Sequence, residues 1–564
     1  MGPADQALDA KRAARLTWLL AIAVCAAGCW PFYADLALPP MAADAPVLLA
    51  RVDPARGEAL EWILSQPHFG VTWRPATMAS VALDLLLGGG RIGWLRVVDL
   101  LLHAGACLTV FAVARRVVPG RAGASWCALL VALGHPLVLE VVPFLPRRSY
   151  SLCVVLAGCG TLSLLGARAR VFLPALAAAA LFALALMAHE VAGFWIVGAF
   201  GLNLAVAEDP RATLGARARR AAALFGPTAL AATLVLVRRA QILEGGGGYA
   251  AGDARLSVAE VLTRLAEGLL PGAGGLPPLA GAAALTGALL LYAGRGGRGR
   301  ALALLAWLAC GAGVLALQGV WFERMAQPLL APLALALGLL VGAGSRTPRV
   351  LGLFLVALAL AHSPLVHGVD PKWRAARRAR AGLIEELEVA ARSALAEASE
   401  GEAVTLRLVL PFREGGEEAP EASSPAEAGE HAPQGEVLQR DAPAAQAEGR
   451  GRAARRLLSR DALQPVRWVQ HLLDPAPITL SPWVWIEEPT APYGPPPEVT
   501  PDGALELTVD RSILVVRPGT TNPRRRPSNA GARLAIPRVR QEEGRVWLYA
   551  YGWDAPVPVP LPMR

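Results

Sequence analysis

Long apolar blocks separated by short polar connections run through the first 366 residues of this sequence. A helix that crosses the hydrocarbon core of a bilayer needs about 20 residues, and many of the blocks approach that length. The chain of 564 residues is 54% hydrophobic and only 18% charged, which leaves too little polar surface to cover one soluble globule. The pattern therefore predicts a mainly α-helical protein that crosses a membrane several times.

Run length divides this apolar region into about eleven predicted membrane spans. Their ranges are roughly 16–34, 93–114, 122–142, 149–167, 171–188, 190–206, 221–237, 278–293, 301–318, 325–343 and 350–366. The first block follows a basic segment, as a cleaved leader would, but the many later spans favour an uncleaved first helix.

Basic residues mark alternate connections between the blocks. They are Lys11, Arg12 and Arg15, then Arg115, Arg116 and Arg121, Arg168 and Arg170, Arg211, Arg217, Arg219 and Arg220, Arg295, Arg298 and Arg300, and Arg346 and Arg349. Because cytoplasmic loops carry excess Lys and Arg, the N-terminus is predicted inside, and an odd number of spans puts the C-terminus outside. The same pattern explains the net charge of +9 without nucleic acid, for which the sequence has no binding motif.

The composition changes after the predicted membrane domain, residues 1–367. Residues 368–411 show helical periodicity followed by a strand pattern, "AVTLRLVLP", and residues 412–455 form a low-complexity tract that cannot bury a core. Residues 456–564 contain several strand patterns, among them "ALELTVD", "SILVVRP", "ARLAIP" and "RVWLYAY". We expect a small α+β domain outside the membrane.

The cysteines give no sign of a metal site. All seven lie in apolar stretches, without the paired spacing of zinc ligands, and are predicted to be core residues. No cofactor is predicted, and the sequence leaves a divalent metal open, since one loop aspartate is thin support for it.

Ionisable residues end the third predicted span, in the stretch "GHPLVLEVVPFLPRR" (134–148). Glu140 lies about 7 Å of helix rise beyond His135, and two prolines then end the helix and release Arg147 and Arg148 at the surface. An ionisable side chain deep in a bilayer costs about 2.5 kcal/mol or more unless it faces a partner or water. The stretch therefore predicts a polar cavity, with interfacial anchoring of the arginines and plain packing as the alternatives.

Similar groups recur at other connections that are predicted to face outward. Arg74 precedes the second long span, His189 and Glu190 lie between the fifth and sixth, and Glu323 and Arg324 lie between the ninth and tenth. Within the second span, His103 fits a buried core histidine as well as a cavity-lining one. The long outer loops and these charges indicate a site on the outer side.

These segments resemble a known family. The stretches "TWRPATMASVALDLLLGG", "GWLRVVDLLLHAGACLTVFAVARRV" and "ASWCALLVALGHPLVLEVVPFLPRRSYSL" are similar to the membrane region of the transmembrane and tetratricopeptide-repeat O-mannosyltransferases and their bacterial relatives. The resemblance is close from Trp73 to about Leu152 and looser to about residue 343. No 34-residue repeat follows the last span.

The resemblance implies a C-type glycosyltransferase, which transfers a sugar from a polyprenyl phosphate to an acceptor, here a protein or a glycan, at the outer face of a bacterial cytoplasmic membrane. An acidic residue of the first outer loop would be the base, with Asp44 first and Asp35 second. The implied donor and phosphate ligands are Arg148, Arg147, Arg74 and Arg324, and the implied cavity-lining residues are His135, Glu140, His103, His189 and Glu190.

The sequence also departs from the family pattern. Ala43 and Asp44 stand where relatives carry two aspartates, Arg96 and Asp99 where they tend to have His and Asn, and His189 where they have Lys. A catalytically inactive relative, acting as a membrane scaffold or lipid-binding protein, is therefore the alternative function. A secondary transporter is disfavoured, because its site would lie near the midplane of internal repeats.

Overall fold

The computed structural model describes residues 3–367, with gaps at 34–35, 37–44, 55–56, 69–71, 90, 168–170, 207–212, 245–255, 274–276, 278 and 319–322, and beyond residue 367 it describes a set of β-strands. The chain divides into two compact units, Met1–Arg374 and Ala375–Arg564. The candidate site lies in the first unit.

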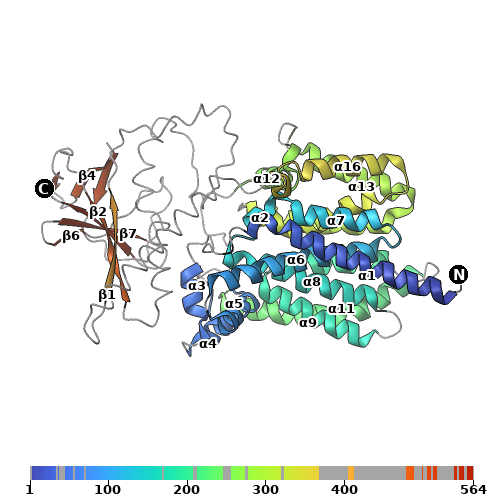
Figure 1. Ribbon diagram of the computed structural model, residues 1–564, viewed down its shortest axis with the longest axis horizontal. Coiled ribbons are helices and arrows are strands. Elements are labelled where there is room, and N and C mark those ends of the chain that lie inside the picture. Colours follow the sequence, from blue (N-terminus) through green and yellow to red (C-terminus); the bar gives the residue numbers. More distant parts are fainter. Residues whose placement is uncertain are drawn as a thin grey trace. The chain divides into compact units, whose positions relative to one another are not determined.

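The first unit is a bundle of helices that run roughly along one direction (Figure 1). Its first half contains α1 (Pro3–Gly28), α2 (Trp30–Tyr33), α3 (Ala45–Val52), α4 (Ala59–Ser65), α5 (Pro75–Gly88), α6 (Ile92–Val117), α7 (Ala122–Gly134), α8 (Arg148–Gly166) and α9 (Phe172–Ala188). Its second half contains α10 (Ala192–Ala205), α11 (Leu214–Ile242), α12 (Val258–Leu269), α13 (Ala280–Tyr292), α14 (Arg298–Gln318), α15 (Leu330–Val341), α16 (Arg346–Ala359) and α17 (Pro364–His367).

Within the described residues, six helical segments are long and apolar enough to cross a membrane. They are Lys11–Phe32, Gly93–Val117, Leu145–Gly166, Ala218–Ile242, Arg298–Leu317 and Arg324–Val341. Each of the eleven predicted ranges contains a helix, but several of these helices are shorter than a span requires. The structure thus agrees with a mainly helical protein that has several membrane-spanning helices. The number of eleven spans stays a prediction.

The third predicted span is wrong in its extent. We expected a helix over 122–142, but α7 ends at Gly134, and His135 has an extended backbone with φ −68° and ψ 138°. Pro136 explains the break, because a proline ring clashes with α-helical geometry at the residue before it. The chain continues as two short 3₁₀ turns, η2 (Pro136–Glu140) and η3 (Leu145–Arg147).

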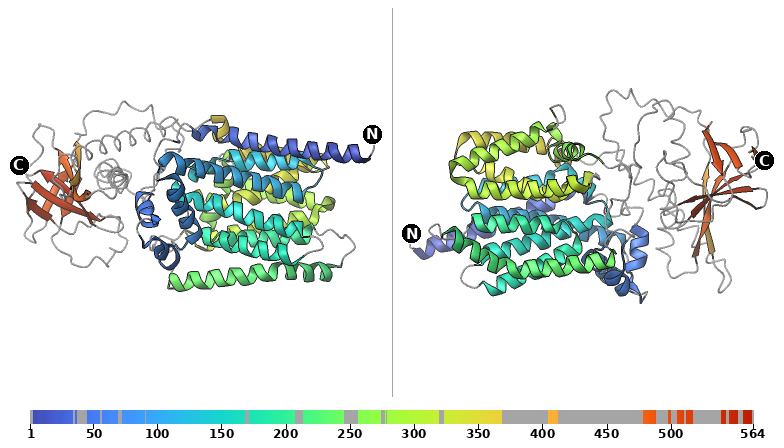
Figure 2. Two further views of the ribbon diagram at one scale, coloured as in Figure 1. Left: turned by 60° about the horizontal axis from the view of Figure 1, so that its bottom comes forward. Right: turned by 180° about the vertical axis from the view of Figure 1, so that it is seen from behind.

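Small residues allow close contact between helices of the bundle. Gly198 of α10 lies against the indole of Trp307 on α14, and this indole packs edge-on against Trp195, with ring centroids 4.8 Å apart. Gly338 of α15 lies against the backbone of Ala124 on α7. In lipid, such packing contributes to helix association that the hydrophobic effect cannot drive. The longest helix, α11, lies at the outside of the bundle (Figure 2).

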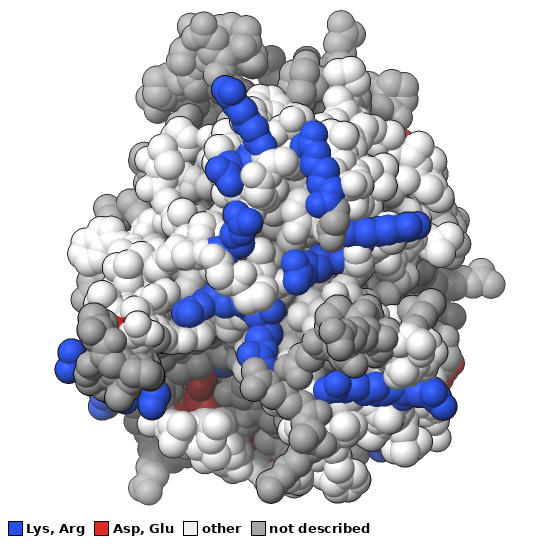
Figure 3. Space-filling model, turned by 90° about the vertical axis from the view of Figure 1, so that its right-hand side faces the viewer, with Lys and Arg blue, Asp and Glu red and all other residues white. Residues whose placement is uncertain are grey.

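The arginine-rich connections meet at one end of the bundle. Arg115, at the end of α6, lies with its guanidinium 5.8 Å from the ring centroid of Trp18 on α1. Arg295, after α13, donates a hydrogen bond to Ser345, before α16, at 3.0 Å. Figure 3 shows Lys and Arg side chains gathered on this face. Those alternate connections that the structure describes therefore lie together, as the charge pattern predicted.

Short helices cover the opposite end of the bundle, where α3, α4 and α5 lie together (Figure 1). The apolar segment "TMASVALDLLLGG" (77–89) is too short to span a bilayer and suits its interface, and the sequence that begins near Leu256 has an amphipathic helical pattern; the structure has α5 and α12 there. Ser257 and Glu260 form a reciprocal capping box at the start of α12, which fixes its first residue.

The second unit contains β1 (Val404–Pro411), β2 (Ile478–Glu487), β3 (Glu498–Val499), β4 (Leu505–Val509), β5 (Ser512–Val516), β6 (Val539–Glu542), β7 (Arg545–Tyr551) and β8 (Pro556–Pro562). β1 pairs with β2 in parallel, whereas β3–β4–β5 and β6–β7–β8 are antiparallel meanders. The predicted helix after residue 368, the tract 412–455 and the strand pattern "ARLAIP" lie outside the described residues. The α+β domain as a whole stays a prediction.

Candidate functional site

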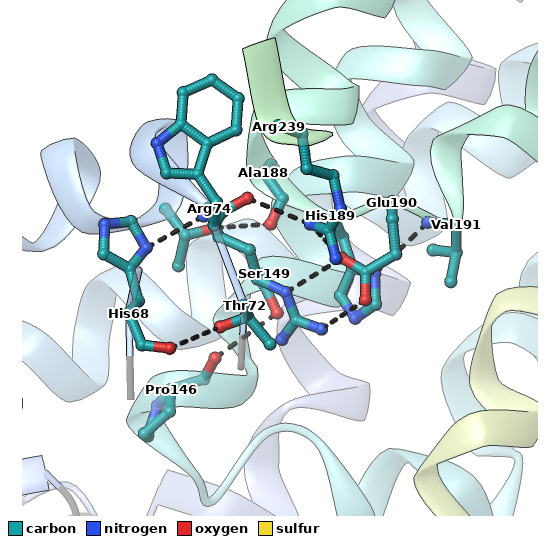
Figure 4. A network of polar contacts seen from close by, with 12 residues as sticks. His68, Thr72, Arg74, Pro146, Ser149, Ala188, His189, Glu190, Val191 and Arg239 are labelled. Atoms are coloured by element: carbon teal, nitrogen blue, oxygen red, sulfur yellow. Dashed lines mark hydrogen bonds and ion pairs between the residues drawn. The ribbon is translucent and has the colours of Figure 1, made fainter. Parts of the chain in front are cut away.

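Arg74 and Glu190 form an ion pair through two hydrogen bonds (Figure 4). The pair lies beside the start of α5, at the end of the bundle opposite the basic connections (Figure 1). Arg74 Nε donates to Glu190 Oε2 at 3.2 Å, and Nη2 donates to Oε1 at 2.9 Å. Arg74 is the residue immediately before α5, and Glu190 lies in the turn between α9 and α10. This parallel geometry matches a planar guanidinium to a carboxylate and fixes both groups.

A closed turn positions Arg74. His68 and Thr72 pair as an isolated antiparallel bridge, and His68 Nδ1 accepts the backbone N–H of Arg74 at 2.9 Å. His68 Nε2 lies 3.1 Å from the carbonyl oxygen of Ile63, which requires Nε2 to carry the proton. Burial lowers the pKa of His68 to about 4, so the ring is neutral at pH 7. Pro75 then begins α5 with a backbone already suited to a first helical turn.

Glu190 has a second guanidinium beside it. Arg239, near the end of α11, places Nη1 3.5 Å from Glu190 Oε2 and donates to the carbonyl oxygen of Trp73 at 3.3 Å. Burial opposes ionisation of Glu190, but the guanidinium of Arg74 holds the pKa of this carboxyl well below its usual value. Among these described side chains, two permanent cations share one anion, so the three together carry a net charge of about +1.

His189 completes this group, which we call the Glu190 cluster (Arg74, His189, Glu190 and Arg239). Its ring stacks on Tyr150, with centroids 4.3 Å apart, and its Nδ1 accepts the backbone N–H of Val191 at 3.3 Å. Burial, with help from the field of Arg74, lowers the pKa of His189 to about 3. The neutral ring therefore carries its proton on Nε2, and this buried nitrogen has no hydrogen-bond partner among the described residues.

Arg148 lies in the interior, and the prediction that Pro143 and Pro146 release it at the surface is wrong. Its side chain is 0% exposed and donates from Nε to Asp99 at 2.8 Å and from Nη1 to Asp84. Nη2 donates to the carbonyl oxygen of Leu95 at 3.3 Å. The three prongs of this guanidinium are therefore bound by protein groups.

The same network includes Arg96, which donates to Asp99 at 3.1 Å and to the carbonyl oxygen of Val142 at 2.9 Å. Two aspartates and two arginines thus neutralise one another in a buried cluster. The physical reason for the error about Arg148 is that a buried arginine is stable when carboxylates from other helices meet it. Those carboxylates are distant in sequence.

Arg147 and Glu140 pair with each other nearer the surface. Arg147 Nη1 donates to the carbonyl oxygen of Glu140 at 2.7 Å and to Oε2 at 3.1 Å, and its guanidinium lies 3.7 Å from the ring centroid of Phe144. This local pair closes the loop between α7 and α8. The structure does not bring either residue into the Glu190 cluster.

Two of the predicted cavity histidines have structural contacts instead. His135 is fully buried; its Nδ1 accepts the backbone N–H of Leu137 at 3.2 Å, and its Nε2 lies 3.0 Å from the carbonyl oxygen of Leu269 on α12. His103 is buried in α6, with Nε2 3.8 Å from Cys107 Sγ. The expectation that His135 lines a polar cavity is therefore wrong, because the backbone occupies both ring nitrogens.

Of the remaining predicted site residues, one lies near the Glu190 cluster and two lie in segments that the structure does not describe. Arg324, at the start of η6 (Glu323–Leu329), is half-buried and close enough for its charge to lower the pKa of His189. Asp35 and Asp44, the candidate bases, lie outside the described residues. Among the residues that the structure describes, no group of three His, Cys, Asp or Glu side chains could hold a metal ion.

Sequence reasoning missed several members of these clusters. Arg239 and His68 were not selected, since the adjacent arginines Arg238 and Arg239 after an apolar block are typical of an interfacial anchor, and a single loop histidine carries no pattern. Asp84 is a single charge within the apolar segment 77–89 and carries no pattern either. A signal did exist for Arg96 and Asp99, because residues at i and i+3 on one helix face each other and opposite charges pair there.

The fold and site together define a mainly helical protein with several helices long and apolar enough to span a membrane, and with ion clusters at one end. Comparison of the chain with protein-family models, with curated proteins and with solved structures found no match.

Proposed function

We propose that this protein is an integral-membrane glycosyltransferase, which transfers a sugar from a polyprenyl-phosphate donor to an acceptor at the membrane surface. The observation that supports this function best is the Glu190 cluster, where Arg74 and Arg239 outnumber the carboxylate at one end of the apolar bundle. An anionic group attached to a lipid chain fits such a place, because its charge meets guanidinium groups while its tail stays in the hydrocarbon.

The cluster has the donors that a lipid phosphate needs. Arg74 and Arg239 supply charged N–H groups, and the buried Nε2–H of His189 is a further donor beside them. Donors fixed in advance stabilise the negative charge that develops on a leaving phosphate without reorganising at that moment. Glu190 holds the arginines in place, and Arg324 adds positive potential from the neighbouring turn.

The chemical step follows the resemblance described above. The acceptor hydroxyl attacks the anomeric carbon, the bond from that carbon to the phosphate oxygen breaks, and the hydroxyl proton passes to a carboxylate, for which Asp44 is the first candidate and Asp35 the second. The lipid phosphate leaves as an anion. On this proposal the first 367 residues contain eleven spans in a bacterial cytoplasmic membrane, with the Glu190 cluster and the tail outside.

A lipid-binding scaffold is the second candidate, and the network around Arg148 favours it. That arginine is bound by Asp84 and Asp99, so one of the implied phosphate ligands serves the fold instead. A scaffold needs the phosphate site but no base. Both functions therefore predict donor binding, and only the glycosyltransferase predicts sugar transfer.

Binding and transfer assays on the purified full chain test both functions. Radiolabelled polyprenyl-phosphate sugars should bind, and Arg74→Gln should weaken binding by about 1.5–3 kcal/mol, the loss expected for a charged hydrogen bond. Glu190→Gln should bind the donor at least as tightly as the unmodified protein, because it removes the competing anion. Arg264→Gln, at an exposed position on α12, is the control and should leave binding unchanged.

Arg74→Gln should lower the affinity for the donor, whereas Glu190→Gln should keep or raise it. A general loss of stability would not produce such opposite effects. If both weaken binding equally, the cluster is only a structural ion pair. Asp44→Asn should spare donor binding and stop transfer, since an amide cannot accept the proton. Donor binding without any transfer or hydrolysis by the unmodified protein would favour the scaffold.

A further inference from the structure

The end of the bundle that holds the arginine-rich connections presents many Lys and Arg side chains among apolar groups, and we call it the basic face (Figure 3). Its exposed or half-buried cations are Lys11, Arg12, Arg15, Arg115, Arg116, Arg121, Arg219, Arg220, Arg295, Arg298, Arg300, Arg346 and Arg349. The connections 115–121, 293–300 and 344–349 contain no Asp or Glu, whereas the connection between α10 and α11 contains Glu208 and Asp209. Within the first three of these segments, then, the cations have no carboxylate close to them in the sequence.

Arg115 is distinguished from its neighbours by aromatic contacts. Its guanidinium lies 5.8 Å from the ring centroid of Trp18 and 5.7 Å from that of Phe111, and these two rings pack edge-on at 5.4 Å. Its Nη1 atom is buried and has no hydrogen-bond partner among the described residues. The ring faces stabilise the cation without using its N–H groups, so the guanidinium keeps its capacity to bind an anion.

The surface beside Arg115 is apolar. On α1, Leu19 and Ile22 are 63% and 51% exposed, and Trp18, one turn before Ile22 on the same side of the helix, is 37% exposed. Within the most apolar part of α1, only 22% of the residues are buried in the protein. Arg15 lies one turn before Trp18, on the same side of the helix. A cationic site with an aromatic wall thus borders a surface suited to hydrocarbon.

We propose that the basic face binds anionic phospholipids, and that Arg115, Trp18 and Arg15 form one headgroup site. The phosphate meets the guanidinium groups, the indole lies at the level of the headgroup, and the acyl chain lies along Leu19 and Ile22. The cationic, aromatic and apolar groups follow one another in the order of a phospholipid, with the site for the anion outermost and the apolar contacts deeper in the membrane. This site is at the other end of the bundle from the Glu190 cluster and is independent of the proposed function.

Lipid exchange on the full chain in nanodiscs tests the proposal. The protein is reconstituted with phosphatidylglycerol at varied fractions in phosphatidylcholine, and bound lipid is counted by native mass spectrometry after release. Phosphatidylglycerol should be retained in preference to phosphatidylcholine, and Arg115→Gln should reduce that retention about tenfold, the effect of losing one charged hydrogen bond. Trp18→Leu, which stays apolar but removes the ring, should reduce it in the same direction.

Arg116→Gln is the matched control, because Arg116 is exposed on the basic face and its substitution removes the same charge. It should lower retention much less than Arg115→Gln. Equal effects of the two variants would show that the face attracts anions without a defined site, and would overturn the assignment to Arg115. Inorganic phosphate should not compete at millimolar concentration. Full competition by it would mean that the ligand is a soluble anion and would overturn the assignment to a lipid.

Discussion

Replacing Arg148 with alanine should destabilise the protein strongly, because the arginine holds two buried carboxylates. Asp99 would keep Arg96 as a partner, at 3.1 Å, but Asp84 would lose its ion pair with Arg148. The Asp84 side chain is 7% exposed and the Asp99 side chain 3%, so water cannot replace the lost guanidinium. The perturbation therefore leaves an uncompensated charge in the interior.

The expected magnitude follows from these contacts. Removing one partner of a buried ion pair costs about 3–5 kcal/mol, and Arg148 makes two such contacts that do not add independently. We expect Arg148→Ala to lower the free energy of unfolding by about 4 kcal/mol, within that range. Arg148→Lys should lose less, since the ammonium keeps the charge but lacks the planar fork that reaches both aspartates.

The neighbouring residue provides the control. Arg147 also pairs with a carboxylate, but its side chain is 15% exposed and that of Glu140 is 36% exposed. Screening by water makes such a pair weak, so Arg147→Ala should cost about 1 kcal/mol or less. Unfolding of each variant in mixed micelles, followed by tryptophan fluorescence over increasing dodecyl sulfate, measures the difference. If Arg148→Ala costs no more than Arg147→Ala, the buried network is refuted and the surface location that the sequence suggested is restored.

Three further outcomes are expected. Burial lowers the pKa of His68 from 6.5 to about 4, so between these values the unfolded chain binds more protons and stability falls as pH is lowered. The loss of stability from protonation of His68 amounts to about 3 kcal/mol at most. His68→Asn, which keeps an acceptor for the backbone N–H of Arg74, should remove this contribution from the pH dependence of unfolding. Gly198→Val should disrupt the packing of α10 on α14, because its side chain would overlap the indole of Trp307; an unchanged unfolding midpoint would contradict this. Reporter fusions after Arg220 and after Arg380 should show cytoplasmic and external activity respectively, and an external signal from the first would invert the proposed orientation.

The sequence by itself determined the class of protein and the places where its helices form. Apolar runs and their arginine-rich connections depend on hydropathy and local charge, which are properties of neighbours in the chain. The same holds for α12, because Ser257 and Glu260 lie within one turn and cap each other without help from elsewhere. The end of α7 is also determined by a neighbour in the sequence, Pro136, although we predicted a longer helix there.

Tertiary structure alone decided which ionisable groups meet. Arg74 and Glu190 are 116 residues apart, and Arg148 is 64 residues from Asp84, so no periodicity within one helix could pair them. The sequence showed that charges gather at one end of the bundle, but a charge there can be an anchor, a ligand or part of a buried network. Helix packing chooses among these, because it sets the depth of each side chain and the partners within about 3 Å, and with them the cost of its charge.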